Sequence, residues 1–252
     1  MKKLNMPVPE KSAHKVQIGC AGWTIAKEHS SLFPAAGTHL QRYATMFDMV
    51  EINSTFYRLP KAETILKWKN EVPEHFRFAV KLSKEITHIG RLKALDKLPL
   101  FVERVQLLAE KLGPILIQLP PSLGFEEKLA TQFFQAFRLC TEGDAVLEPR
   151  HQTWFTPAAF ELLKTYHLAL VAADPPHNTA GTVPGGWAGL QYYRLHGSPD
   201  MYYSKYDEAY LLDLAKKVKI ASKDCPVWVV FDNTASGAAV GNGLFLKGLL
   251  DA

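Results

Sequence analysis

Polar residues repeatedly follow short apolar runs in this sequence, often as pairs two positions apart. Three such pairs end the segments 49–53, 145–150 and 192–196, namely Glu51 with Asn53, Glu148 with Arg150, and Arg194 with His196. In a β-strand, residues i and i+2 point to the same side. Each pair therefore aims two polar groups in one direction, at the end of a segment that otherwise favours burial. We infer that binding or chemistry takes place at these segment ends.

The carboxylates and imidazoles of this set could transfer protons. Glu51 and Glu148 are candidate general acids or bases, and His196 and His151 are the side chains that titrate nearest to neutral pH. The alternative for the two glutamates is static, since they could pair with neighbouring cations and hold the loops together. A single histidine is more often structural than catalytic, so both interpretations stay open for each imidazole.

Cations and polar side chains near the same ends could bind an anionic ligand. Arg150 and Arg194 suit bidentate capture of a phosphate or a carboxylate. Lys81 could supply a point charge or, if it is desolvated, a nucleophilic amine. We expect further ligand contacts from residues at other strand ends: Trp23, Asn53, Tyr57, Gln118, Asp174, Asn233 and Thr234. The aromatic members could stack on a ring-shaped ligand or only pack the loops.

The segment 233–239 allows two interpretations of its own. It is rich in small residues and precedes the last predicted helix, where backbone N–H groups favour an anion such as phosphate. The alternative is that Thr234 or Ser236 caps this helix and that the small residues serve close packing.

The sequence contains no motif that predicts a metal or a cofactor. It has no HExxH, EF-hand, GxGxxG or P-loop pattern. Glu51, Glu148, Asp174 and His196 would be one combination of metal ligands. The cations expected beside them would repel a metal ion. We therefore predict neither a metal nor a cofactor.

Elements that would position these residues alternate along the chain. We expect strands over 16–19, 50–53, 76–81, 115–118, 145–148, 169–173, 192–195 and 227–231. Amphipathic helices are expected over 38–47, 61–71, 98–112, 126–137, 157–166, 207–221 and from about 236 to 250. This order predicts an α/β protein with a (β/α)8 TIM-barrel fold, in which the C-terminal strand ends share one mouth. Residues 174–191 are rich in proline and glycine, so an irregular connection between strands six and seven replaces a helix, either as a lid or as a plain surface excursion.

Length and composition limit the domain organisation, the compartment and the classes of partner that we expect. The 252 residues suit a flexible N-terminal tail over 1–15 and a single barrel domain over 16–252. A net charge of +4 favours anionic partners only weakly. Three separated cysteines without a CxxC motif fit a reduced, cytoplasmic compartment. We see no signal peptide and no apolar run that could span a bilayer, so we expect no membrane partner. Nothing in the sequence indicates an oligomeric state.

The chain resembles the YecE-like family, a domain of unknown function numbered 72. The resemblance is carried by residues 18–23, 43–44, 50–58, 76–81, 118–121, 148–151, 154–155, 193–197 and 232–234, and it extends from about 18 to 243. It implies a TIM barrel, with kinship to the endonuclease-IV and xylose-isomerase groups. Those groups place metal ligands at the barrel mouth, whereas this chain has more cations and fewer ligand clusters there.

Our leading hypothesis is an enzyme that acts on a small anionic, phosphorylated ligand at the barrel mouth by acid/base chemistry, as a hydrolase, lyase or isomerase. One alternative is a protein that binds nucleic acid or processes it with a metal in the manner of endonuclease IV, with aromatic side chains stacked on bases. A second alternative is a metabolite-binding module without catalysis.

Overall fold

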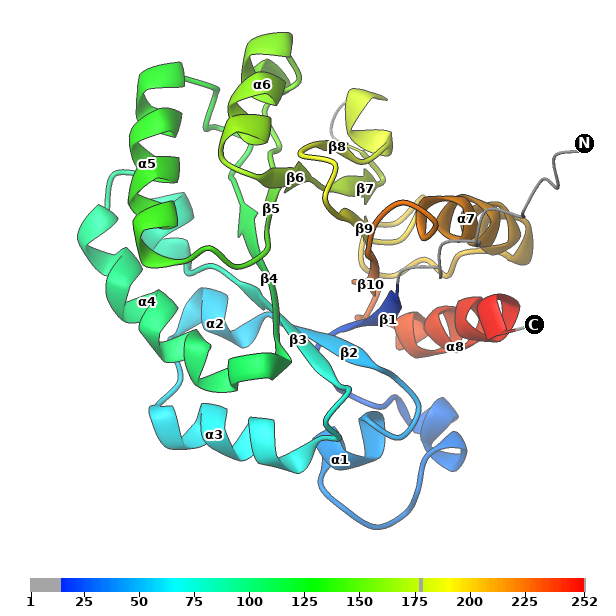
Figure 1. The fold of residues 1–252 in the computed structure, drawn as a ribbon. Coiled ribbons are helices and arrows are strands. Elements are labelled where there is room, and N and C mark those ends of the chain that lie inside the picture. Colours follow the sequence, from blue (N-terminus) through cyan, green and yellow to red (C-terminus); the bar gives the residue numbers. More distant parts are fainter. Residues whose placement is uncertain (1–14, 177–178, 252) are drawn as a thin grey trace, which may run out of the picture.

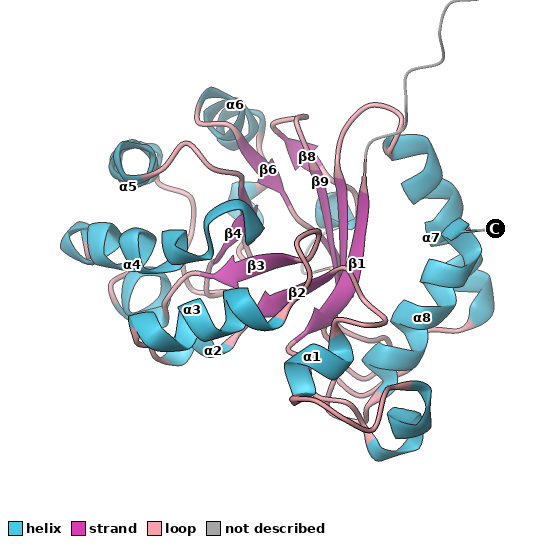
Figure 2. Cartoon of the chain, turned by 60° about the horizontal axis from the view of Figure 1, so that its bottom comes forward, coloured by secondary structure: helices cyan, strands magenta, loops and turns pink. Residues whose placement is uncertain are grey.

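The protein forms a nearly closed barrel of parallel strands surrounded by helices, seen in a computed structural model that describes residues 15–176 and 179–251 (Figures 1 and 2). The strands are β1 (Val16–Ala21), β2 (Met49–Ile52), β3 (Arg77–Lys81), β4 (Leu112–Gln118), β5 (Ala145–Glu148), β6 (Leu168–Leu170), β7 (Ala172–Asp174), β8 (Gly185–Gly186), β9 (Gln191–Leu195) and β10 (Val227–Phe231). Their order in the sheet is β7-β9-β10-β1-β2-β3-β4-β5-β6-β8. The predicted α/β barrel is confirmed. The expected tail, except for Lys15, lies outside the described residues.

The sixth predicted strand closes the barrel in two pieces. It is divided at Val171 into β6, which pairs with β5, and β7, which pairs with β9. All of these pairings are parallel. This one segment of chain therefore lies between β5 and β9 and links these two strands.

The helices lie outside the strands (Figure 2). They are α1 (His39–Tyr43), α2 (Ser54–Tyr57), α3 (Ala62–Glu71), α4 (Leu98–Val105), α5 (Glu127–Cys140), α6 (Pro157–Thr165), α7 (Glu208–Ala221) and α8 (Ala238–Asp251). The predicted helix over 98–112 instead ends at Val105 and continues as a 3-10 segment, in which Ala109 has a φ of 50° that interrupts the helix. No helix in the described ranges is long and apolar enough to cross a membrane.

Local side-chain caps explain where several helices begin. The Thr156 hydroxyl accepts a hydrogen bond from Ala159 N at 3.4 Å, and Pro157 occupies the first helical position of α6. Thr38 and Gln41 form a reciprocal capping box at α1.

The connection after β7 contains no α-helix in its described part, as the sequence predicts. It has a 3-10 turn over Thr179–Thr182 and the short strand β8, which pairs antiparallel with β6. Residues 177 and 178 lie outside the described residues.

Side chains alternate between two apolar clusters along each strand. One cluster packs between the strands and the helices and includes Val50, Val80 and Leu147. The other fills the barrel interior, and its members are Met49, Ala79, Leu116, Val146, Ala169, Val171, Leu190, Tyr192, Trp228 and Val230. This alternation is the period-two pattern of strands that are buried on both faces, and it determines which side chain reaches the interior of the mouth.

Candidate functional site at the barrel mouth

A layer of polar side chains lies beyond the apolar interior, toward the C-terminal ends of the strands. Each member follows an inward-facing apolar residue by two positions along its own strand: Glu51 follows Met49, Lys81 follows Ala79, Gln118 follows Leu116, Glu148 follows Val146, Arg194 follows Tyr192 and Asp232 follows Val230. Because side chains at i and i+2 share a side of a strand, all six point into the barrel. We call this set the polar layer.

Arg194 lies at the centre of the polar layer and is entirely shielded from solvent, with 0% exposure. Its guanidinium makes a two-pronged ion pair with Glu51, in which Nε lies 3.0 Å from Oε2 and Nη2 lies 2.7 Å from Oε1. Nη1 donates to Glu148 Oε2 at 2.7 Å, and Nη2 also donates to Asp232 Oδ2 at 3.0 Å. Four hydrogen bonds to three carboxylates leave little of this group for an external anion.

His196 bridges two of the same carboxylates. Its Nδ1 lies 2.9 Å from Asp232 Oδ2 and its Nε2 lies 3.2 Å from Glu148 Oε1. A ring nitrogen donates to a carboxylate only when it carries a proton, so both nitrogens are protonated in this arrangement. Burial alone would lower the pKa of His196, but the charge of Glu148 and the hydrogen bond to Asp232 raise it above its ordinary value. The geometry and the pKa direction both indicate an imidazolium.

The same contacts keep the carboxylates ionised. Burial favours protonation of Glu148, yet Arg194 and His196 outweigh burial and hold the pKa of Glu148 well below its usual range. The pKa of Asp232 is lowered for the same reasons. Glu148 and Asp232 therefore serve as fixed negative charges at neutral pH.

Neighbouring side chains complete the hydrogen bonding of the carboxylates. Tyr192 donates to Glu51 Oε2 at 2.9 Å, and Gln118 donates to Glu148 Oε2 at 3.1 Å. Arg150 lies at the edge of this network, with its Nη2 3.4 Å from Glu148 Oε1. Its buried Nε has no hydrogen-bond partner among the described residues. Arg150 is thus attached to the network by one long contact and retains an unused donor.

Lys81 differs from the other cations of the mouth. No residue in the described ranges gives its Nζ a hydrogen bond or an ion pair, and the ammonium lies 4.3 Å from the centre of the Phe56 ring. Burial and the charge of Arg194 lower the pKa of Lys81 to about 8, although Glu148, Glu51 and Asp232 act in the opposite direction. Lys81 is therefore the cation of the mouth that the network leaves unpaired, among the side chains described.

His88 also lies at the mouth, on the loop that follows β3. It lies on a π-helical turn over Glu85–Ile89, and its ring packs edge-on against Phe56 with centroids 4.9 Å apart. Burial and the charges of Lys81 and Arg150 lower the pKa of His88, so the imidazole is neutral at pH 7. A turn of this kind is common at functional sites.

Two further residues of the network were not among the predicted site residues, although the sequence contains a signal for each. Tyr192 precedes Arg194 by two positions and so shares its side of β9. Asp232 directly follows β10 and continues its inward alternation after Val230. For His88 there is no comparable spacing signal.

The structure gives two of the predicted side chains local partners outside the network. The ring of His151 lies 2.9 Å from the Thr153 hydroxyl and accepts a bond from Thr153 N, so it caps the turn over Gln152–Trp154. Asn233 is buried and donates to Ser204 O and to Asn242 Oδ1. Both residues hold backbone segments in place, and within the described ranges neither forms a hydrogen bond or an ion pair with Arg194 or Lys81.

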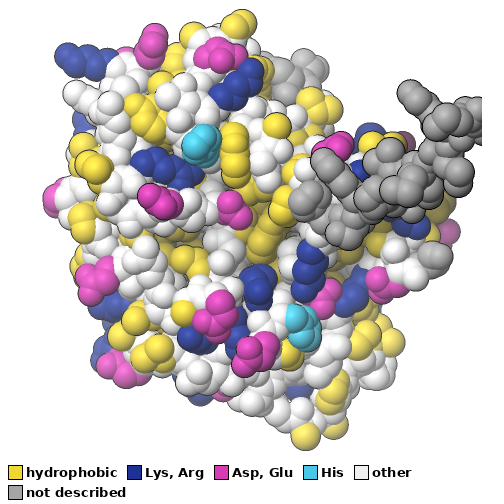
Figure 3. All heavy atoms as spheres, in the orientation of Figure 1, with side chains coloured by type: hydrophobic (Ala, Val, Ile, Leu, Met, Phe, Trp, Pro, Cys, Tyr) yellow, Lys and Arg dark blue, Asp and Glu magenta, His cyan; other side chains and the backbone are white. Residues whose placement is uncertain are grey.

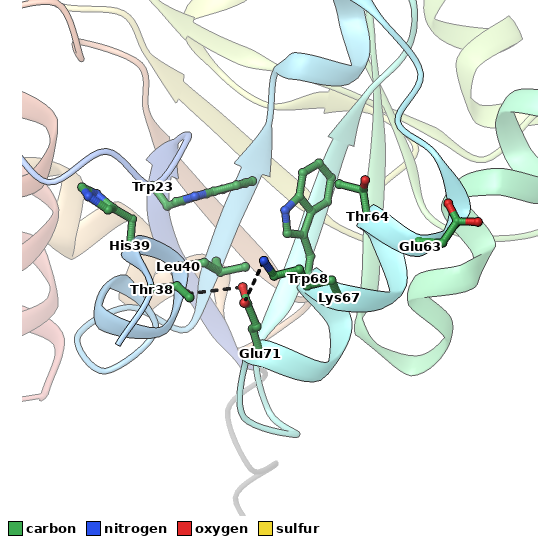
Figure 4. A pocket seen from close by; sticks show the side chains of 9 residues that line it. All are labelled: Trp23, Thr38, His39, Leu40, Glu63, Thr64, Lys67, Trp68 and Glu71. Carbon is green, nitrogen blue, oxygen red and sulfur yellow. Dashed lines mark hydrogen bonds and ion pairs between the residues drawn. The ribbon is translucent and has the colours of Figure 1, made fainter. Parts of the chain in front are cut away.

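Trp23 lines a separate cavity of about 380 Å³ between α1 and α3 (Figure 4). Its ring meets Trp68 nearly at right angles, with centroids 5.2 Å apart. On the floor of this cavity Glu71 accepts a hydrogen bond from Thr38 and lies 3.8 Å from Lys67 Nζ. Trp23 is thus brought together with α3 and not with the polar layer.

The remaining predicted residues occupy the rim. Tyr57 is 69% exposed and lines a cavity of about 440 Å³ beside α4. Asp174 accepts a hydrogen bond from Tyr206 at 2.8 Å. Thr234 is exposed beside a cavity of about 160 Å³ at the start of α8. Asn53 directly precedes α2, and its buried Oδ1 has no partner among the described residues.

The carboxylates of the polar layer are paired with cations and are not arranged as a set of metal ligands. In the described ranges, no group of three or more His, Cys, Asp and Glu side chains could hold a metal ion. Arg194 occupies the position between Glu51, Glu148 and Asp232 that a cation would otherwise take.

The chain is similar to curated bacterial proteins over most of its length. It is 27% identical to the UPF0759 protein YunF of Bacillus subtilis (strain 168), over 94% of this chain and 95% of that protein. It is 33% identical to the UPF0759 protein YecE of Escherichia coli (strain K12) over 141 residues, which are 56% of this chain and 50% of YecE.

Solved structures show the same fold. A DUF72 family protein from Enterococcus faecalis V583 matches with a TM-score of 0.80 at 23% identity, covering 94% of this chain and 96% of that chain. A DUF72 family protein from Thermotoga maritima MSB8 matches with a TM-score of 0.78 at 23% identity, covering 95% and 100%. A xylose isomerase-like TIM barrel/4-hydroxyphenylpyruvate dioxygenase fusion protein matches with a TM-score of 0.52 at 13% identity, covering 95% of this chain and 43% of that one. These likenesses concern the fold alone.

The model of a family described as protein of unknown function DUF72 matches residues 17–252. That range includes every residue of the polar layer and all of the barrel strands except Val16. The chain therefore belongs to the DUF72 family.

Proposed function

We propose that the barrel mouth binds a small anionic ligand, preferably a phosphorylated one, and that the protein converts this ligand by proton transfer. The observation that carries the proposal is a charge imbalance. Three carboxylates, of Glu51, Glu148 and Asp232, face four cations, of Arg194, His196, Arg150 and Lys81. An anion would balance the remaining positive charge, which lies on the unpaired Lys81 ammonium.

The division of roles follows from the contacts. Among the described residues of the mouth, Lys81 Nζ and Arg150 Nε are donors without a hydrogen-bond partner. They would therefore bind the anionic part of the ligand. Arg194 is occupied by carboxylates and would hold the layer rigid. Removing solvent from the mouth strengthens attraction between an anion and these cations.

Proton transfer is assigned to His88 in this proposal. A neutral imidazole beside two cations can accept a proton, and the pKa of His88 is lowered by burial together with Lys81 and Arg150. Glu148 is a weaker base than expected from sequence, because its pKa lies well below its usual range. In place of the acid/base role expected from sequence, Glu148 is assigned to hold Arg194 and His196 in position, and Glu51, which binds Arg194 through both oxygens, is assigned to hold Arg194. Hydrolase, lyase and isomerase reactions all remain compatible with these groups.

Calorimetric titration with inorganic phosphate tests the proposal. We expect binding by the wild type and at least a tenfold loss of affinity in Lys81→Met and in Arg150→Met, since each substitution removes a charge-assisted contact. Lys219→Met is the matched control, because Lys219 is exposed in the last turn of α7. Equal phosphate affinity in all four proteins would contradict the proposal.

Exposed aromatic side chains favour one alternative, the binding of single-stranded nucleic acid. Tyr57 is 69% exposed and Tyr203 is 63% exposed, and both follow strands at the mouth end. The face drawn in Figure 3 carries basic and acidic side chains side by side and no continuous basic stripe. This mixed charge favours a small ligand over a nucleic-acid strand. Oligonucleotide binding that weakens steeply with salt would favour the alternative.

A further inference from the structure

Lys81 is a primary amine placed at the inner edge of the mouth, where no described residue is a polar partner for it. Its neighbours in the polar layer include three carboxylates, yet no ion pair to Nζ exists in the described ranges. Arg194 and His196 donate to Glu51, Glu148 and Asp232, so each of these carboxylates has a cationic partner other than Lys81. The amine is thus close to the network but not bound by it.

The surroundings of the amine favour its neutral form. Lys81 is largely buried, and the charge of Arg194 repels a second cation. With a pKa of about 8, roughly one tenth of the Lys81 side chains carry a free lone pair at pH 7. For an ordinary lysine that fraction is on the order of one in a thousand or less. Desolvation next to another cation is a recognised way to make a lysine nucleophilic.

We propose that Lys81 Nζ forms a covalent imine with an aldehyde or ketone ligand that carries an acidic group. The inference rests on the proposed function, since it requires the anionic part of the ligand to bind at the mouth, beside Arg150. It narrows the substrate class to carbonyl compounds with a carboxylate or a phosphate.

The step balances without an oxidant or a reductant. The lone pair of Nζ attacks the carbonyl carbon, and a proton passes from nitrogen to the former carbonyl oxygen to give a carbinolamine. Loss of that hydroxyl with one proton releases water and leaves the C=N bond. In this proposal His88 takes the proton from nitrogen and returns it to the departing hydroxyl; its ring packs against Phe56, the same ring that the Lys81 ammonium covers.

Reductive trapping tests the inference. Wild-type protein is incubated at pH 7 with sodium cyanoborohydride and one of three probes, namely pyruvate, glycolaldehyde phosphate or acetaldehyde, and modified peptides are quantified by mass spectrometry. The peptides that contain Lys84 and Lys219 serve as references, and we expect the reduced adduct at Lys81 to form on the order of 100-fold faster than the neutral fraction of an ordinary lysine would allow. The two anionic probes should react at lower concentration than acetaldehyde, which lacks an acidic group. Preference for one of the two anionic probes distinguishes a carboxylate ligand from a phosphate ligand.

Lys81→Arg is the control for folding and charge. It keeps a cation but lacks a primary amine, so it should fold like the wild type by circular dichroism and lose the adduct at position 81. Lys219→Arg, at an exposed position on α7, is the variant that should keep both phosphate binding and the Lys81 adduct. If wild-type protein binds phosphate but shows no preferential adduct at Lys81, the imine is refuted and the proposed anion site stands. If phosphate does not bind and adducts are spread evenly over the lysines, both proposals fail.

Discussion

The Arg194 guanidinium and the Glu51 carboxylate form a buried two-pronged ion pair, with N–O distances of 3.0 and 2.7 Å and 0% exposure of both side chains. Arg194 comes from β9 and Glu51 from β2, which are not neighbours in the sheet. The pair therefore links opposite parts of the barrel across its interior. Its position explains why a group that could capture a ligand anion is instead part of the scaffold.

Replacing Arg194 by methionine should strongly destabilise the protein. The change leaves the carboxylates of Glu51, Glu148 and Asp232 buried without their shared cation, and breaking a buried pair in this way costs about 3–5 kcal/mol. Denaturant unfolding followed by circular dichroism measures the effect. The control is Arg58→Met, because Arg58 is exposed and its loss should change stability by about 0.5 kcal/mol or less. Similar unfolding midpoints for both variants would show that the network adds nothing to stability.

Tyr192 and Tyr193 offer a matched test of the polar layer on a single strand. Tyr192 donates to Glu51, whose carboxylate is paired with Arg194, whereas Tyr193 faces the other side of β9 and donates to the neutral amide of Gln191. Hydrogen bonds to charged groups are stronger, so Tyr192→Phe should lower the free energy of unfolding by about 1.5–3 kcal/mol and Tyr193→Phe by about 0.5–1.5 kcal/mol. Denaturant titration of the two variants checks the order. A larger loss in Tyr193→Phe would be inconsistent with a charged partner for Tyr192.

The barrel and most of the polar layer could be predicted from the sequence because both depend on local periodicity. Strand alternation places Glu51, Glu148 and Arg194 on the inner side of their strands, and the structure confirms these elements. The irregular connection after β7 was predictable from its proline and glycine content.

The pairing inside the mouth could not be predicted, because it depends on distances between strands far apart in the chain. Sequence spacing shows that Arg194 and Glu148 reach the same mouth. It does not show that the N–H groups of Arg194 donate to three carboxylates. In the same way, it does not show that a π-helical turn brings His88 to Phe56 or that His151 turns back to cap its own loop.

The contribution of His196 to stability should depend on pH in a defined direction. Its pKa is raised in the folded protein by Glu148 and Asp232, against the effect of burial. The folded state therefore binds the proton more tightly, and the stabilisation is complete below the unfolded pKa of about 6.5 and is lost as the pH rises through the folded pKa. The difference in free energy of unfolding between wild type and His196→Gln should thus be largest near pH 6 and shrink at alkaline pH.

Two measurements accompany this titration. Nitrogen-15 NMR should show both ring nitrogens of His196 protonated at pH 7. His151→Gln serves as the control for loss of a histidine near the mouth, since His151 contacts Thr153 and not a carboxylate. A wild-type advantage over His196→Gln that grows with rising pH would reverse the predicted sign.

Binding of an anion should raise the pKa of Lys81. In the free protein burial and Arg194 lower that pKa to about 8, and an anion beside the ammonium favours its charged form. With saturating inorganic phosphate, the titration of Lys81 should therefore move toward the ordinary lysine value of about 10.4. Carbon-13 NMR of the lysine ε-carbons follows the titration, and Lys81→Arg assigns the resonance. Lys219 is the internal reference because it is exposed on α7. If phosphate binds but leaves the Lys81 titration where it was, the anion lies elsewhere in the barrel and the role given to Lys81 is wrong.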